Sequence, residues 1–401
     1  MLALKRMRRR AGLFVAVFGV VLMLAGLSVG LSGYLGAAAA AGVRAGVSAL
    51  TGADGGFAVS IPWPAGKSAQ AAQDTRVRDT VRSVVLADGR AVPMVVDRDI
   101  MTANNVQLDR SAGTPVQSAL ASIPALSSRA SLVAGKWPAA LDEASMQADA
   151  AAALGVQVGE RLSLPGNSSV TITATWRATN PDDPRWQDDP ITLRGVEPDA
   201  YGTRGWIVID PVLWGKITVD PVARWTIRPV PDRVTVAQLA ALQTSPDSVL
   251  KALQRADSSQ EIRETGLLQV ALRPIQQNVV SAAAVSTAPL VVVAVLGIIT
   301  LVELARMLDQ LRAAENALVR ARGASRRRSV LEAAAEGVLV AVPGAVLGAA
   351  LAVWALSGSG AVRYIPTVGW AAAVACVAVA VGALAAVAGR ASRDARPATS
   401  R

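Results

Sequence analysis

Four apolar stretches, each long enough to cross a lipid bilayer as a helix, constrain this chain more than any other feature of its sequence. They cover residues 11–31, 281–302, 333–356 and 367–388. The hydrocarbon core of a bilayer requires about 20 helical residues, and each stretch supplies that length with almost no charge. Residues 32–280, between the first two stretches, have the composition of a folded polar domain. The sequence therefore predicts an α-helical membrane protein with four transmembrane helices and a large α+β domain inserted between helices 1 and 2.

The positive charge of the chain lies next to these stretches. The formal net charge is +10, yet residues 36–280 carry 23 basic and 24 acidic residues and are nearly neutral. Five basic residues precede the first stretch, seven lie in 303–336 and four in 389–401, whereas Arg363 alone lies in 357–366. Lys and Arg accumulate on the cytoplasmic side of membrane proteins. We therefore predict that residues 1–10, 303–332 and 389–401 are cytoplasmic, that 32–280 and 357–366 are extracytoplasmic, and that the charge indicates topology rather than nucleic-acid binding.

The residue types exclude several kinds of chemistry. The chain has no histidine and a single cysteine, Cys376, which lies in the fourth apolar stretch. This excludes Cys/His zinc sites, His-dependent catalytic triads and a disulfide. The nearest match to a phosphate-binding loop, Gly66-Lys67-Ser68, has Ile61 where that motif requires its first glycine. We therefore expect no catalytic residue, metal site or bound cofactor on this chain.

The first apolar stretch has an alternative interpretation as a cleaved signal peptide, because small residues follow it at 36–42. Its length favours a membrane anchor, since the apolar core of a signal peptide usually has 7–15 residues. Gly26 and Gly30 in this stretch, and Gly344 and Gly348 in the third, have the four-residue spacing that allows two helices to approach closely.

Local patterns within 32–280 predict short strands and helices. Apolar residues alternate at Val170, Ile172, Ala174 and Trp176, which predicts a strand, and Pro-Gly-Asn at 165–167 predicts a hairpin turn that joins it to 161–164. Further strands are predicted at 191–195, 206–209 and 224–228. Helices are predicted from residue 142 or 143 to Leu154, from 235 to 242, and from about residue 260 into the second apolar stretch.

Two groups of residues in this domain have a functional and a structural interpretation. Carboxylates at Asp182, Asp183, Asp188 and Asp189 are ligands of the kind that calcium prefers, but their spacing fits no EF-hand loop and the prolines among them favour a structural turn. Seven tryptophans could line a substrate surface, although packing is their commoner role: Trp63, Trp137, Trp176, Trp186, Trp206, Trp214 and Trp225. The sequence does not determine the role of either group.

The segment 303–332 has a helical pattern with a sharp interruption. An apolar stripe continues from the second stretch through Leu304, Leu308, Leu311, Leu318 and Val319. Arg322-Gly323 indicates a helix stop, and Ser329-x-x-Glu332 indicates a capping box at the start of the third helix. These residues allow two interpretations: a helical elbow that contacts a partner protein, or a basic hairpin that contacts anionic lipid.

A family resemblance favours the elbow. Residues 315–327 (ENALVRARGASRR), followed by an Ala/Leu/Gly-rich stretch that contains Glu336, resemble the cytoplasmic signature of FtsX-like permeases, the family that includes the MacB and lipoprotein-releasing transporters. Residues 132–138 (LVAGKWP), 154–162 (LGVQVGERL) and 176–190 are similar to the outer domain of that family. The resemblance covers the whole chain in order and topology, although long relatives join two such units and this chain has one.

The resemblance implies a permease subunit of an ATP-binding-cassette transporter in the bacterial plasma (inner) membrane. It implies a dimer with a second permease, identical or related, and two copies of a separate ATPase subunit that binds ATP and Mg²⁺. In such assemblies the segment between helices 2 and 3 docks into the ATPase. The matching positions are Glu315, Leu318, Val319, Arg320, Arg322, Gly323, Ala324, Ser325 and Arg326, of which Arg322 departs from the apolar residue that many members carry.

The expected role is to transmit ATPase motion to the extracytoplasmic domain for export or extraction of a substrate, without enzymatic activity on this chain. Two alternatives remain open. One is a mechanotransmitter that uses the same motion to activate a cell-wall hydrolase. The other is a membrane-anchored sensor or scaffold that works without an ATPase.

Overall fold

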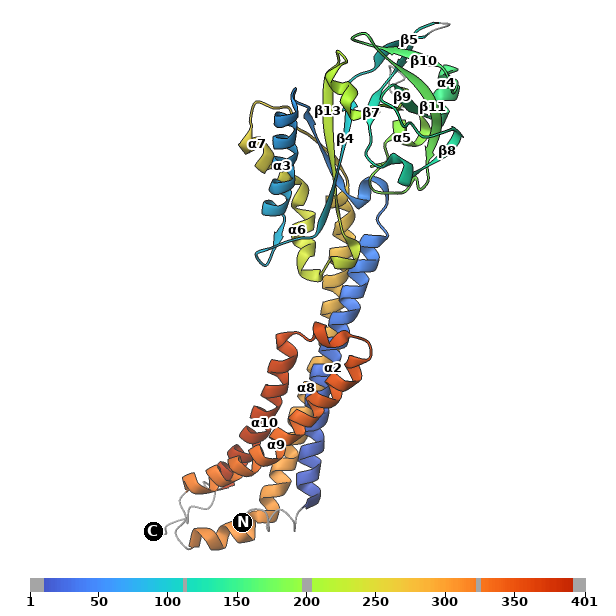
Figure 1. Cartoon of the computed structure of the whole chain (residues 1–401). Helices are drawn as coiled ribbons and strands as arrows, with labels where there is room; N and C mark the ends of the chain where they lie inside the picture. The colour runs from blue at the N-terminus through green and yellow to red at the C-terminus, as the bar shows by residue number, and fades with distance from the viewer. Residues whose placement is uncertain (1–10, 111–113, 197–203, 322–325, 392–401) are drawn as a thin grey trace. The chain divides into compact units, whose positions relative to one another are not determined.

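The structure is a computed structural model that describes residues 11–110, 114–196, 204–321 and 326–391. The chain divides into two compact units. The helical unit comprises Met1–Ala41 and Val279–Arg401, and the sheet unit comprises Gly42–Asn278. Figure 1 labels the main helices and strands of both units.

Four long helices form the helical unit. They are α2 (Ala11–Ser48), α8 (Leu268–Ala321), α9 (Arg326–Ser357) and α10 (Thr367–Ala391), with the 3₁₀ helix η6 (Ala361–Tyr364) between the last two. Within the described residues, the parts long and apolar enough to cross a membrane are Gly12–Ser48, Val291–Leu308, Val330–Ser357 and Thr367–Ala388. The prediction of four such helices is confirmed, and these helices indicate a membrane protein.

Three helix boundaries differ from the predicted ones. The apolar part of the second helix is Val291–Leu308 rather than 281–302. Helix α2 continues to Ser48 because residues 36–42 are alanine and glycine, and alanine has the strongest intrinsic helix preference. Helix α9 begins at Arg326, so Ser329 lies inside it and the predicted capping box is wrong. Glu332 instead accepts a hydrogen bond at 3.2 Å from Arg328, which lies one turn earlier on the same helix.

Helices α2 and α9 approach each other closely at the paired glycines. A Cβ atom added at Gly26 would lie 3.1 Å from the carbonyl oxygen of Gly348, and one added at Gly344 would lie 3.0 Å from that of Phe18. A Cβ atom at Gly348 would collide with the backbone oxygen of Leu22. Any larger side chain would therefore push the helices apart, as expected for small-residue packing in membranes. The prediction that these glycines form close-packing faces is confirmed.

The sheet unit contains a twelve-stranded sheet among the described residues, in the order β14-β1-β13-β4-β7-β12-β9-β11-β10-β5-β6, with β8 paired to β11. Its strands are β1 (Phe57–Pro62), β4 (Met94–Thr102), β5 (Val106–Arg110), β6 (Val116–Ser118), β7 (Leu120–Ser122), β8 (Ala130–Gly135), β9 (Glu143–Gln147), β10 (Arg161–Leu164), β11 (Ser168–Ala178), β12 (Ile207–Val208), β13 (Pro221–Pro229) and β14 (Arg263–Gly266). β7 pairs with β12 and β9 with β11 in parallel, whereas the other pairs are antiparallel. A large domain of strands and helices is thus confirmed, but local patterns did not predict a sheet of this size.

Shorter elements complete the sheet unit. They are the hairpin β2 (Leu86–Ala87) and β3 (Arg90–Ala91), the helices α3 (Lys67–Val84), α4 (Ala148–Leu154), α5 (Pro190–Arg194), α6 (Leu239–Gln243) and α7 (Ser245–Ala256), and the 3₁₀ helices η1 (Gly52–Gly55), η2 (Leu126–Ser128), η3 (Pro211–Gly215), η4 (Pro231–Arg233) and η5 (Val236–Gln238). Helices α3 and α7 lie side by side next to β4 (Figure 1). Each buries an i, i+4 pair of apolar residues, Val77 and Val81 in α3 and Val249 and Leu253 in α7.

Several predicted elements of the sheet unit are confirmed. The hairpin joins β10 to β11, with Leu162 opposite Val170 and Leu164 opposite Ser168. The strands predicted at 206–209 and 224–228 correspond to β12 and β13, and the helix predicted at 235–242 corresponds to η5 and α6. The side chains of Val170, Ile172, Ala174 and Trp176 are all buried, as their alternation predicts.

Three predictions in this unit are wrong. Residues 191–195 form helix α5 rather than a strand, because the Asp189 side chain caps its start and Pro190 favours its first turn. The helix predicted from residue 142 or 143 begins only at Ala148, since Glu143–Gln147 pairs with β11 as strand β9. The helix predicted from residue 260 begins at Leu268, after strand β14 has paired with β1.

The glycine contact yields a stability prediction. Gly348→Ala should destabilise the protein by about 1–3 kcal/mol, because the new methyl group forces α9 away from α2. Gly382→Ala is the matched control, since a Cβ atom there meets nothing within 4 Å and alanine favours helix over glycine. Thermal unfolding of both variants in detergent micelles measures the difference. Equal unfolding temperatures for the two variants would show that the α2–α9 contact is not tight.

Candidate functional site

The predicted coupling segment lies at the end of α8 and the start of α9. Helix α8 contains Glu315, Leu318, Val319 and Arg320 in its last two turns, and Arg326 is the first residue of α9. Arg322, Gly323, Ala324 and Ser325 lie outside the described residues. The role predicted for these nine residues stays a prediction.

The apolar stripe on α8 changes its surroundings before it reaches this segment. Leu301, Ala305 and Leu308 are buried in the core of the helical unit. Met307 and Leu311, which follow one another by one helical turn, are instead more than half exposed. Beyond Leu308, the described residues leave the Leu311 side chain of α8 uncovered.

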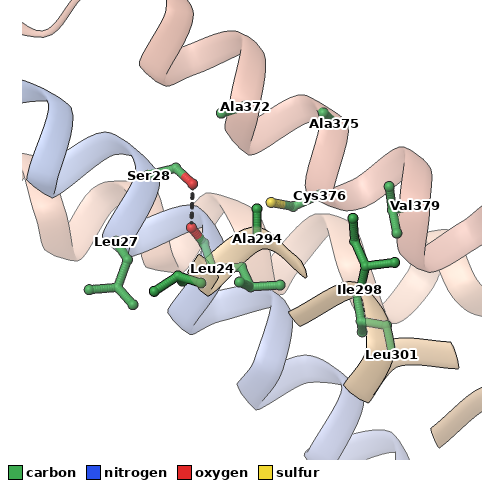
Figure 2. Close-up of a pocket in the computed structure, with 11 residues that line it drawn as sticks. Leu24, Leu27, Ser28, Ala294, Ile298, Leu301, Ala372, Ala375, Cys376 and Val379 are labelled. Atoms are coloured by element: carbon green, nitrogen blue, oxygen red, sulfur yellow. Dashed lines mark hydrogen bonds between the residues drawn. The ribbon is translucent and has the colours of Figure 1, made fainter. Parts of the chain in front are cut away.

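A pocket of about 160 Å³ lies within the helical unit, between α2, α8 and α10 (Figure 2). Leu24 and Leu27 line it from α2, Ile298 and Leu301 from α8, and Cys376 from α10. The sequence did not predict it, since a pocket depends on which helices meet and no local pattern records that.

The sheet unit contains a network of buried arginine and aspartate side chains. The Arg185 side chain is 2% exposed, and its Nη2 donates at 2.9 Å to Asp99 Oδ1, whose residue is 1% exposed. The same nitrogen donates at 3.1 Å to the Pro124 carbonyl oxygen. Arg228 Nη2 donates at 2.7 Å to Asp97 Oδ2. Arg185 and Arg228 thereby attach the loop after β11 and strand β13, respectively, to two carboxylates of strand β4.

The acid-rich loop belongs to this structural network. Asp188 Oδ2 accepts a hydrogen bond at 2.8 Å from the Ala53 amide. Asp189 Oδ2 accepts one at 3.0 Å from the Trp206 indole, and Asp183 lies 3.8 Å from Arg228. No group of Asp, Glu or Cys that could hold a metal ion occurs among the described residues. The hydrogen bonds and ion pair of this loop are those of a structural turn.

The tryptophans of the sheet unit are packing residues. Six of the seven are less than 9% exposed: Trp63, Trp176, Trp186, Trp206, Trp214 and Trp225. Trp137 is partly buried against a core cluster that includes Trp186 and Trp206. Several indole nitrogens donate to internal acceptors, such as Asp74 Oδ1 for Trp225 at 2.8 Å and Ser122 Oγ for Trp214 at 2.8 Å, whereas the buried Trp176 nitrogen has no acceptor among the described residues. The six buried indoles therefore present no surface to a substrate.

Neighbouring arginines lower the pKa of two partly buried carboxylates, Asp97 and Asp74. Burial raises the pKa of Asp97, but the hydrogen bond and charge of Arg228, together with the charges of Arg185 and Arg129, outweigh it and hold the pKa below the ordinary 3.8. Burial also raises the pKa of Asp74, but hydrogen bonds from Arg78 and Trp225 outweigh it, so that the pKa is lowered. A carboxylate whose pKa is lower in the folded than in the unfolded state stabilises the fold at pH values above its unfolded-state pKa. This stabilisation is lost as the pH falls through the folded-state pKa. The network thus stabilises the sheet unit at neutral pH.

Comparison with known proteins adds little to this geometry. No protein-family model matches the sequence, and no curated protein matches it. Among solved structures, the chain is similar to a crystallised domain of a "putative Permease protein" from Porphyromonas gingivalis, at 11% sequence identity and a TM-score of 0.29. That similarity covers 56% of this chain and 99% of the other. Because the TM-score is so low, we base neither fold nor function on it.

The buried network yields a second stability prediction. Arg185→Ala should destabilise the protein by about 3–5 kcal/mol, because it leaves Asp99 buried without its closest cation. Arg82→Ala is the control, since the Arg82 side chain is 75% exposed and a surface pair contributes about 1 kcal/mol or less. Urea unfolding of the full-length protein, followed by tryptophan fluorescence, reports mainly on the sheet unit, which holds seven of the nine tryptophans. A midpoint for Arg185→Ala equal to that of the control would contradict the structural role of this network.

Proposed function

We propose that the chain is the permease subunit of an ATP-binding-cassette transporter of the FtsX/MacB type. One observation carries the proposal: a single set of four helices of membrane-spanning length, with a large folded domain between the first and second and a basic helical elbow between the second and third. This is the organisation that the sequence resemblance implies. Export or extraction of a substrate is the activity proposed for the assembly.

The distribution of basic residues supports the orientation in this proposal. Both termini and the elbow carry the excess of Lys and Arg, which favours their location in the bacterial cytoplasm. The sheet unit, whose sequence is nearly neutral, would then lie outside the plasma membrane. With Cys376 as the only cysteine of the chain, that unit relies on its core and its arginine–aspartate network rather than on disulfides.

The length of α8 supports a role in coupling. Helix α8 continues beyond Leu308, where its apolar span ends, to Ala321, and α9 begins only a few residues later. On this extension, Leu311 is 54% exposed and lies about two helical turns before Leu318 and Val319 in sequence. Exposed apolar side chains of this kind favour contact with another surface. We propose that two copies of a separate ATPase supply that surface and that ATP and Mg²⁺ bind only there.

In the proposed mechanism, ATP binding closes the two ATPases, and the elbow transmits that motion to α8 and α9. A second permease, identical or related, completes the assembly. Helix α8 is continuous from Leu268, in the residue range of the sheet unit, to Ala321 at the elbow. The sheet unit would therefore shift when the elbow moves. The chain itself contributes no step of ATP hydrolysis.

A double substitution tests the coupling proposal. Leu318→Asp together with Val319→Asp should abolish co-purification of the ATPase and permease-dependent ATP turnover, because an unpaired charge buried at an interface costs several kcal/mol. Arg320→Glu with Arg326→Glu should weaken the same contact, in part through charge interactions that salt screens. The measurement is ATPase recovery and turnover after purification in mild detergent.

The matched control is Leu132→Asp with Val133→Asp. These two neighbouring apolar residues are 40% and 51% exposed on strand β8 of the sheet unit, so the control adds the same charge away from the elbow. It should retain the ATPase. Full coupling in the Leu318/Val319 variant would show that the segment is a basic hairpin at the lipid surface and not a coupling element.

A further inference from the structure

The pocket between α2, α8 and α10 has a wall made almost wholly of hydrocarbon. Of the residues that line it, Ser28 and Cys376 alone have polar side-chain atoms. The Ser28 hydroxyl donates to the Leu24 carbonyl oxygen of its own helix at 2.7 Å (Figure 2). A buried water requires two to four polar partners, and this wall does not offer them. The pocket therefore suits an apolar occupant.

The size of the pocket sets the size of the occupant. Its volume is about 160 Å³, and an apolar protein cavity of roughly 150 Å³ holds a molecule the size of benzene. About six carbon atoms of a hydrocarbon chain occupy a comparable space. A whole lipid does not fit, but the end of one acyl chain does.

The pocket is accessible from the side of the helices. Leu27 and Ile298, which both line it, are 49% and 44% exposed. Neighbouring apolar residues on the same helices, such as Val295 at 49% and Val374 at 70%, are also exposed. In a helix that spans a membrane, surface of this kind faces acyl chains. The acyl chains of the surrounding lipid can thus enter the pocket through this opening.

From this geometry we propose that the pocket binds the end of one acyl chain of a bilayer phospholipid. This binding site goes beyond the permease proposal and does not depend on an ATPase. An acyl chain fills the volume without leaving a polar group unpaired, and its glycerol and headgroup stay outside among the other lipids. A helix of a second copy, packed over the opening, is the competing occupant.

Photo-crosslinking tests the proposal with the full-length protein alone in liposomes of phosphatidylethanolamine and phosphatidylglycerol. A small fraction of the phospholipid carries a diazirine at the terminal carbon of one acyl chain, and mass spectrometry maps the adducts. Ile298 lines the pocket, whereas Ile299, at 53% exposure, does not, so the two residues give an internal comparison. Adducts should be enriched at Ile298 over Ile299.

Filling the pocket should remove that enrichment. Ala294→Leu with Ala372→Leu adds bulk to two lining residues, and Ala371→Leu with Ala378→Leu adds the same bulk to exposed positions of α10 that do not line the pocket. The filled variant should lose the Ile298 adducts and keep those at Ile299, whereas the control should keep both. Equal lipid adducts at the two isoleucines of the unaltered protein, or fewer at Ile298 than at Ile299, would overturn the proposal. The comparison of Ile298 with Ile299 in the unaltered protein tests the proposal even if the filled variant does not fold.

Discussion

The close approach of the α2 and α9 backbones at Gly26 and Gly348 determines how the helical unit packs. Because no side chain separates these helices, α2 can serve as the common neighbour of the other segments of the unit. Gly36 of α2 lies against the backbone of Tyr364 in η6, and Gly369 of α10 lies against Ser32. Helix α10 then presents alanines towards α8, so that α2, α8 and α10 meet around a pocket rather than a filled core. Small residues thus produce both the tight contact and the pocket.

The sheet unit is organised by charge as well as by its apolar core. The buried Arg185 side chain is hydrogen-bonded to Asp99. In the loop around it, Asp188 accepts a hydrogen bond from a backbone amide, Asp189 accepts one from an indole, and Asp183 lies near Arg228. The tryptophans also turn inward, so the features that most suggested a ligand site in the sequence serve stability instead. The proposed function therefore depends on the helical unit and its elbow.

The sequence predicted what depends on neighbours along the chain and missed what depends on distant partners. The apolar helices, the glycine faces and the β10–β11 hairpin follow from composition and spacing. Residues 143–147 have a helical pattern, yet the pairing of β9 with β11 and β12 makes them a strand. The Arg185–Asp99 pair joins residues 86 positions apart, and the only local signal for it is the charged Asp97-Arg98-Asp99 run within a strand. The elbow residues 322–325 lie outside the described part of the chain, so their role rests on the resemblance.

Topology tests the central claim most directly, because the permease proposal requires the sheet unit and the elbow to lie on opposite sides of the membrane. In a Cys376→Ser background, single cysteines at Lys5, Arg320, Ala395 and Asp183 can be exposed to an impermeant maleimide in intact bacterial cells. The account predicts labelling of Asp183→Cys alone, with the other three labelled only after the membrane is permeabilised. Labelling of Arg320→Cys from outside intact cells would contradict it.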